Sequence, residues 1–154
     1  MKLIKLAILS IVVLFLVALG ISLLIPSHIR ISRAANFPAP AGSVLAPVTD
    51  TLQWKNWNPP FMKPDSGLAP GASTRITPLR QTDSLFEVRL SQGARSVVSG
   101  WQLYSHSRTD SLTLQWYMDF DLKWYPWEKF SSLFFEATYG NMMEKGLANL
   151  GNRQ

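Results

Sequence analysis

The sequence predicts an α+β fold: one apolar helix at the N-terminus, then an antiparallel sheet, and a long helix at the C-terminus. Three observations predict it. An uncharged apolar run opens the chain, later segments alternate apolar and polar residues, and the last part places apolar residues at spacings of three and four. With 154 residues and 47% apolar side chains, the chain is long enough for one domain of ordinary size. Its charged fraction of 16% is below the usual quarter, which indicates that part of the chain is not in water.

The run Leu6–Ile25 contains twenty residues and no charge, and Lys2 and Lys5 come just before it. A helix of this length matches the ~30 Å hydrocarbon core of a bilayer and satisfies its own backbone hydrogen bonds. A cleaved signal peptide is the alternative, since Ala18–Gly20 loosely fits a small-x-small cleavage site, and a buried core helix is a third interpretation. Because the apolar run continues past that site, we expect an uncleaved single-pass anchor.

We therefore expect an anchor at residues 1–25 and one folded domain at residues 26–154. The two lysines before the run nearly balance Arg30 and Arg33 after it, and the terminal amine favours an N-terminus inside and a domain outside the cytoplasm. Lys and Arg are otherwise scattered singly, so no nucleic-acid partner is expected. The membrane is the expected partner of residues 6–25.

Alternation and turn residues predict the remaining elements. The five expected strands are residues 28–37, 75–79, 85–90, 95–106 and 112–123. Between the first two strands we expect a short helix over Ser43–Val48 and a second that Asp50 or Thr51 caps. The stretch Phe61–Ser73, rich in Pro and Gly, is expected to be an exposed loop. Trp127–Leu150 is expected to form one amphipathic helix of about six turns.

The last strand and this helix are expected to bury their apolar faces. On the strand, these residues are Leu114, Trp116, Met118 and Phe120. On the helix, they are Phe130, Leu133, Phe134, Ala137, Met143, Leu147 and Leu150. The opposite face of the strand carries Gln115, Tyr117, Asp119, Asp121 and Lys123, which we expect to meet water.

The sequence offers few groups for catalysis. The absence of cysteine excludes disulfides and thiolate sites, and His28 and His106 are too far apart in sequence to suggest a histidine-rich metal site. No G-x-S-x-G, Gly-rich phosphate loop or H-E-x-x-H motif occurs. Asp119, Asp121 and Glu87 are expected on solvated strand faces. We therefore predict no catalytic residue, no metal ligand and no cofactor.

Four segments, in this order, resemble the START-like superfamily, also called SRPBCC. They are the strand, Pro step and helix of His28–Val48, the W-x-x-W-N-P of Trp54–Pro59, the W-x-M of Trp116–Asp119, and the E-K-G-L-x-N-L of Glu144–Leu150. The last is similar to the ending of membrane-anchored members of the polyketide cyclase/dehydrase-like branch. The resemblance implies a helix-grip fold, in which a curved antiparallel sheet wraps around a long C-terminal helix and encloses a cavity. The chain departs from the family in its aromatic segment Lys123–Trp127.

The resemblance and the many aromatic residues together predict membrane-anchored binding of a hydrophobic small molecule or lipid in that cavity. The candidate cavity residues are Trp54, Trp57, Phe61, Phe86, Trp101, Trp116, Met118, Phe120, Phe130 and Phe134. The loop from Trp57 to Ser73 would be the gate. Two alternatives remain: a cyclase- or dehydrase-like enzyme acting in the cavity, which we favour less, and a non-catalytic interaction domain whose aromatic residues fill the core.

The aromatic residues Trp124, Tyr125 and Trp127 have two interpretations. They belong either to the core or cavity rim, or to the membrane interface, where Trp and Tyr are enriched.

Overall fold

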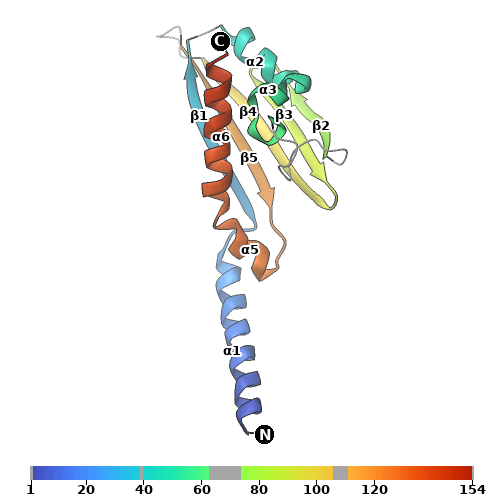
Figure 1. Cartoon of the computed structure of the whole chain (residues 1–154), viewed down its shortest axis with the longest axis vertical. Coiled ribbons are helices and arrows are strands. Elements are labelled where there is room, and N and C mark those ends of the chain that lie inside the picture. The colour runs from blue at the N-terminus through green and yellow to red at the C-terminus, as the bar shows by residue number, and fades with distance from the viewer. Residues whose placement is uncertain (1, 39, 63–73, 106–110, 154) are drawn as a thin grey trace.

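The computed structural model describes residues 2–38, 40–62, 74–105 and 111–153, and it shows a five-stranded antiparallel sheet covered on one face by helices (Figure 1). The helices are α1 (Lys2–Leu24), α2 (Ala41–Thr49), η1 (Thr51–Gln53), α3 (Trp54–Trp57), α4 (Pro59–Met62), α5 (Pro126–Ser132) and α6 (Phe135–Gly151). The strands are β1 (His28–Phe37), β2 (Thr74–Gln81), β3 (Leu85–Gln92), β4 (Arg95–Ser105) and β5 (Leu112–Asp121). Their order across the sheet is β1-β5-β4-β3-β2.

The expected strands form, and β1 has the expected bounds. β2 runs from Thr74 to Gln81, longer than expected, with a register shift between Pro78 and Arg80. A proline is tolerated there because β2 lies at the edge of the sheet. Gly93, at φ 58°, begins the two-residue turn between β3 and β4, a conformation that glycine adopts without steric cost.

The short helices α2 to α4 cover the inner face of the sheet at the end far from α1 (Figure 1). The side chain of Asp50 accepts a hydrogen bond from the amide of Leu52, so the expected cap is confirmed. The expected loop from Phe61 is wrong for its first two residues, since Phe61 and Met62 lie in α4. Phe61 is buried, because its ring packs edge-on against Trp54 at 4.9 Å. Residues 63–73, the rest of the expected gate, lie outside the described residues.

The expected single helix over 127–150 is wrong, because the structure has two helices there, α5 and α6. The break changes which residues face the core. Phe134 and Leu133 lie at the break and are 71% and 62% exposed, whereas Phe135 and Tyr139 pack against Phe120. The break lets α5 pack against α1 while α6 packs against β1, which one continuous helix would not allow.

The first helix α1 extends away from the domain (Figure 1). By length and composition it could cross a membrane. Its side chains are largely exposed except for a stripe near its end, formed by Ala18, Leu19 and Ser22, which Ile25 continues just after the helix. Residues at this spacing share one helix face, and α5 is the helix that packs against α1.

Candidate functional site

The inner face of the sheet is built from rows of side chains that the strand register places side by side. The row far from α1 contains Phe86, Trp101 and Trp116, which pair across β3, β4 and β5; we call it the sealed row. The row nearest α1 contains Ile76, Leu90 and Val97, paired across β2, β3 and β4; we call it the open row. It continues on β5 as Phe120 and on β1 as Ile29.

The sealed row is covered by aromatic side chains from α3 and α4. The ring of Trp54 lies 5.2 Å from that of Trp101, and the ring of Trp57 lies 5.8 Å from that of Trp116. Trp101 and Trp116 stack on each other at 5.4 Å. All four tryptophans are at most 1% exposed. These rings therefore fill the space between the sheet and the short helices.

Three of the four indole N–H groups in this cluster have partners. Trp54 donates to the carbonyl of Val48 at 2.8 Å, and Trp57 donates to the carbonyl of Pro47 at 3.0 Å. Trp116 donates to the hydroxyl of Ser99 at 2.8 Å.

The indole nitrogen of Trp101 and the side-chain oxygen of Asn58 are buried without a hydrogen-bond partner among the described residues. A buried polar group without a partner costs free energy, so these two atoms are where a water or a ligand would bind with most gain.

The open row is only half-buried, although its side chains point to the same face as the sealed row. Among the described residues, α6 contacts this row at its β5 end, where Phe135 and Tyr139 pack against Phe120. Burial raises the pKa of Tyr139 above its ordinary value of 10.0, and Arg95 opposes this shift. The open row is therefore an apolar strip that is accessible at its β2 end and lies at the end of the domain that adjoins α1.

Sequence reasoning missed a charged residue on the inner face. Arg33 donates to Glu136 and to Glu144 on α6, each at 2.7 Å, and hydrogen bonds to these two carboxylates raise its pKa. A Cβ on Gly140 would lie 2.4 Å from the guanidinium, so the glycine makes room for it. The sequence feature that could have predicted this cluster is the pair Glu136 and Glu144, eight residues apart, with Gly140 midway between them. This cluster attaches α6 to β1.

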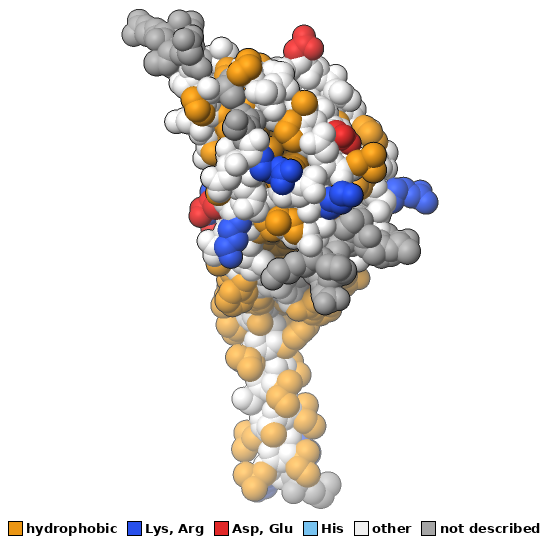
Figure 2. Space-filling model, turned by 45° about the horizontal axis from the view of Figure 1, so that its top comes forward, with side chains coloured by type: hydrophobic (Ala, Val, Ile, Leu, Met, Phe, Trp, Pro, Cys, Tyr) orange, Lys and Arg blue, Asp and Glu red, His pale blue; other side chains and the backbone are white. Residues whose placement is uncertain are grey.

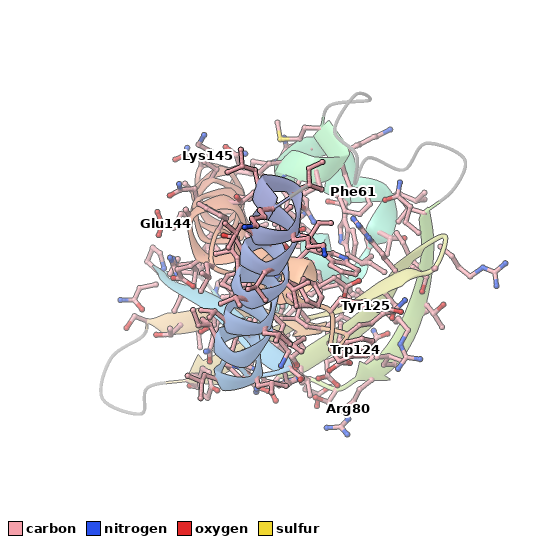
Figure 3. All side chains as sticks on the ribbon, turned by 90° about the horizontal axis from the view of Figure 1, so that it is seen from below. Phe61, Arg80, Trp124, Tyr125, Glu144 and Lys145 are labelled. Atoms are coloured by element: carbon pink, nitrogen blue, oxygen red, sulfur yellow. The ribbon has the colours of Figure 1, made fainter. Side chains whose placement is uncertain are left out.

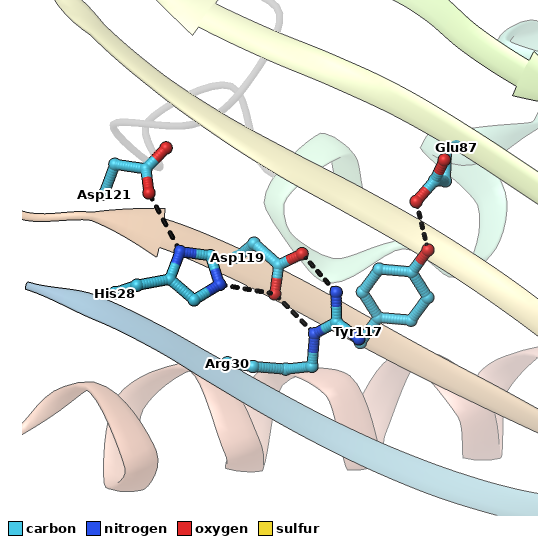
Figure 4. A network of polar contacts seen from close by, with 6 residues as sticks. All are labelled: His28, Arg30, Glu87, Tyr117, Asp119 and Asp121. Carbon is cyan, nitrogen blue, oxygen red and sulfur yellow. Dashed lines mark hydrogen bonds and ion pairs between the residues drawn. The ribbon is translucent and has the colours of Figure 1, made fainter.

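The outer face of the sheet carries a polar network (Figure 4). Arg30 donates to both carboxylate oxygens of Asp119, each at 2.6 Å, and lies over the ring of Tyr117 at 4.4 Å. His28 bonds to Asp121 at 2.9 Å. The expected outward placement of Asp119, Asp121 and Glu87 is confirmed.

The expectation that Tyr117 meets water is wrong. It is 7% exposed, because Arg30 covers its ring and its hydroxyl donates to Glu87. The ring lies over Gly100, where a Cβ would collide with it. Burial, and then the hydrogen bond to Glu87, raise the pKa of Tyr117 well above its usual range.

Most of the expected cavity residues lie together in the buried core. They are Trp54, Trp57, Phe61, Phe86, Trp101, Trp116, Met118 and Phe120. Phe130 is half-buried in α5, and Phe134 is exposed, because the helix break turns both away from the sheet. His106 lies outside the described residues. Among the described side chains, no group of three or more His, Asp or Glu residues is placed to hold a metal ion.

Two surface hollows lie elsewhere. One is lined by Arg89, Ser91, Gly93, Ala94, Arg95, Ser96, Val98 and Asp121. The other is lined by Pro38, Pro40, Ser43, Pro47, Gln53, Leu150 and Arg153. Neither is lined by the aromatic cluster or by the open row.

Comparison with known proteins identifies the fold. No family model matches the chain, and no curated protein matches it. Among solved structures, it is similar to a START superfamily protein from Mycobacterium smegmatis, with a TM-score of 0.54, 17% identity, and coverage of 82% of this chain and 95% of that one. CalU16 from Micromonospora echinospora gives a TM-score of 0.52 at 14% identity, covering 80% of each chain.

DynU16, a protein of the dynemicin biosynthetic locus, gives a TM-score of 0.52 at 18% identity. The likeness covers 80% of this chain but 46% of DynU16. At these identities the likeness concerns the fold. The five-stranded antiparallel curved sheet with its C-terminal helix is a START-like fold.

Proposed function

We propose that this chain binds a hydrophobic small molecule or lipid on the inner face of its START-like domain, next to a membrane that α1 crosses. The open row carries the proposal. Ile76, Leu90 and Val97 are aligned in register and point inward, yet they are only half-buried. An inward-facing apolar strip that the described residues leave half-buried is a surface that a ligand can cover.

The free energy available is sufficient for reversible binding. A ligand that removes about 200 Å² of apolar surface from water gains about 5 kcal/mol, at ~25 cal/mol per Å². The buried row of Val88, Ser99 and Met118 separates the open row from the aromatic cluster and borders the ligand on that side.

Binding is better supported than the cyclase- or dehydrase-like reaction. Acid–base chemistry needs a titratable side chain in reach of the ligand. Among the described residues, no Asp, Glu or His is buried on the inner face, and Glu87 and Asp119 lie on the outer one. Two titratable groups among the described residues that border the inner face are Arg33, already paired with two glutamates, and Tyr139. A domain that serves only as an interaction module would suit the sealed row, but it gives no reason for the open one.

We further propose that α1 is an uncleaved anchor and that the domain lies outside the cytoplasm. The exposure of nearly all the apolar side chains of α1 supports a membrane helix over a core helix, because a core helix would bury them. The apolar run that continues past Gly20 is the argument against cleavage, and Lys2, Lys5 and the terminal amine are the argument for the side.

The test uses the full-length chain in lipid nanodiscs. Mass spectrometry of extracted material would identify co-purified apolar molecules, and the fluorescence of the neutral probe N-phenyl-1-naphthylamine would measure binding. Leu90→Gln should weaken probe binding about tenfold, which corresponds to about 1.4 kcal/mol. Arg89→Gln, adjacent on the same strand but outward-facing, is the matched control and should bind as the unaltered chain does. Equal binding by both variants would contradict the proposal.

A further inference from the structure

We propose that α5 and the aromatic segment before it lie in the bilayer interface, so that the domain sits on the membrane in one fixed orientation. The segment comprises Trp124, Tyr125 and Trp127, and with Leu133 and Phe134 we call it the aromatic base. The inference rests on the membrane anchoring in the proposed function. It goes further because it assigns a partner, the lipid of the bilayer, to the aromatic base, a surface that the ligand site does not use.

The depth of α5 is set by its contact with α1. The stripe of reduced exposure begins at Ala18 on α1 and ends at Ile25, both inside the apolar run that would span the bilayer. Seven residues of helix correspond to about 10 Å along its axis. A helix packed beside these last turns therefore lies at the level of the lipid headgroups and the first part of the acyl chains. The rest of the domain lies above this level (Figure 1).

The side chains exposed at this level are apolar and large. Trp124 and Trp127 are 66% and 63% exposed, and Leu133 and Phe134 are exposed to a similar degree. Figure 2 shows hydrophobic side chains gathered where α1 meets the domain. Seen from below, Trp124 and Tyr125 lie beside the end of α1 (Figure 3). An apolar group of this kind would be costly in water but suits the interface, where Trp and Tyr are enriched.

The aromatic base is rigid within itself. The ring of Tyr125 lies 4.8 Å from that of Trp124 and 4.8 Å from that of Trp127, on which it stacks at 8°. Glu128 accepts a hydrogen bond from the amide of Lys123 at 2.9 Å, which closes the turn that carries these rings.

The joint between α1 and the domain is held by buried polar bonds. Lys129 is 5% exposed, and its ammonium donates to the carbonyl of Ile25 at 2.7 Å. A cation there satisfies a carbonyl at the helix end and complements the helix dipole. The amide of Leu122 donates to the carbonyl of Ser27 at 2.7 Å. Because the joint is fixed on both sides, the span and the aromatic base would enter the bilayer together, and the open row would lie close to the lipid surface.

The test measures depth in the membrane. The chain has no cysteine, so single cysteines can carry nitroxide labels at chosen positions of the full-length protein. Labels at Trp127→Cys and Phe134→Cys report on the aromatic base, and both positions are exposed, so stability changes little. Leu52→Cys, 80% exposed at the far end of the domain, is the control for water. Val13→Cys, near the middle of α1, is the control for the bilayer.

In phosphatidylcholine bilayers, collision with oxygen and with a water-soluble nickel chelate gives the depth of each label by electron paramagnetic resonance. We expect both base labels at a depth between those of Val13 and Leu52, with nickel collisions at least threefold fewer than at Leu52. Base labels as accessible to nickel as Leu52, with Val13 buried in lipid, would overturn the inference and leave the anchor intact. A Val13 label in water would overturn both the anchor and the inference. Loss of probe binding with the depths unchanged would concern the ligand site alone.

Discussion

The sealed row and the open row lie on one face of one sheet, with the row of Val88, Ser99 and Met118 between them, but they differ in what covers them. Both consist of inward-facing side chains in register across β3 and β4. Trp101 in the sealed row is 0% exposed, because α3 and α4 place Trp54 and Trp57 on top of it. Leu90 in the open row is only half-buried by the described residues. The same strand pattern therefore yields a core in one place and a candidate binding surface four residues further along the strand.

The largest expected effect is the loss of stability when one ring of the sealed row is removed. Trp116→Ala removes a fully buried ring that contacts Trp57 and Trp101, and it leaves the hydroxyl of Ser99 without its partner. We expect the free energy of unfolding to fall by about 3–5 kcal/mol, measured by urea denaturation in detergent. Leu52→Ala, at an exposed position, should change it by less than about 0.5 kcal/mol. A loss below about 1 kcal/mol for Trp116→Ala would show that the row is not a packed core.

A smaller loss of stability is expected from a substitution in α6. A Cβ on Gly146 would lie 2.6 Å from the ring of Trp116 and 3.1 Å from Pro59. Gly146→Ala gains about 1 kcal/mol of helix propensity, but we expect the collision to outweigh it and the net loss to be about 1–2 kcal/mol. Gly42→Ala in α2 is the control, since nothing lies within 4 Å of its Cβ, and it should be neutral or stabilising. Thermal unfolding of both variants measures the difference, and equal midpoints would contradict it.

Two tryptophans within the sealed row are expected to differ by about 1 kcal/mol. Trp116→Phe loses a buried hydrogen bond to Ser99, whereas Trp101→Phe removes an N–H that has no partner among the described residues. Both changes remove the same atoms, so the void they leave is similar. We expect urea denaturation to show the greater loss for Trp116→Phe. The reverse order would mean that the N–H of Trp101 is satisfied by a bound molecule, and the probe assay would then show weaker binding for Trp101→Phe.

The open row should respond in binding rather than in stability. Val97 and Val98 are adjacent, identical and both half-buried, but they face opposite sides of the sheet. Each change to Ala should cost about 1 kcal/mol or less. N-phenyl-1-naphthylamine should bind several-fold more weakly to Val97→Ala and unchanged to Val98→Ala. Equal weakening in both would show that the probe does not bind on the inner face.

The smallest expected effect is a pH dependence. The pKa of Tyr139 is raised by burial, so the folded domain holds this proton more tightly than the unfolded chain does. Its contribution to stability is present below pH 10 and is lost as the pH rises above it, toward the folded pKa. A probe bound in the open row buries Tyr139 further and raises its pKa in the folded state, so in its presence this loss should extend to a higher pH and become larger.

Tyr139→Phe should remove that dependence on the probe. Tyr117→Phe is the comparison, because Tyr117 lies on the outer face and a probe in the open row does not reach it. Urea denaturation from pH 8 to 11, with and without N-phenyl-1-naphthylamine, measures both. A probe effect that survives Tyr139→Phe would place the probe elsewhere.

The local pattern of the sequence was sufficient for much of the fold and for part of the site. The alternation of Leu85–Leu90 and the face shared by Trp116 and Phe120 are found as expected, because a strand sends every second side chain to the same side. The pattern failed for Phe134. A spacing of three and four describes one straight helix, but the structure contains two, and nothing in the spacing marks the break.

What the sequence alone determined, then, is which faces are apolar and in what order the elements come. Only the tertiary structure decided what covers each face. Tyr117 is buried on the face that was expected to be exposed to water, because Arg30 covers its ring and Glu87 accepts its hydroxyl hydrogen bond. Arg33 is tolerated on the inner side because Gly140 and two glutamates receive it. Periodicity depends on the geometry of a single element, whereas burial depends on contacts between residues far apart in the chain, and those contacts form only when the helices have packed on the sheet.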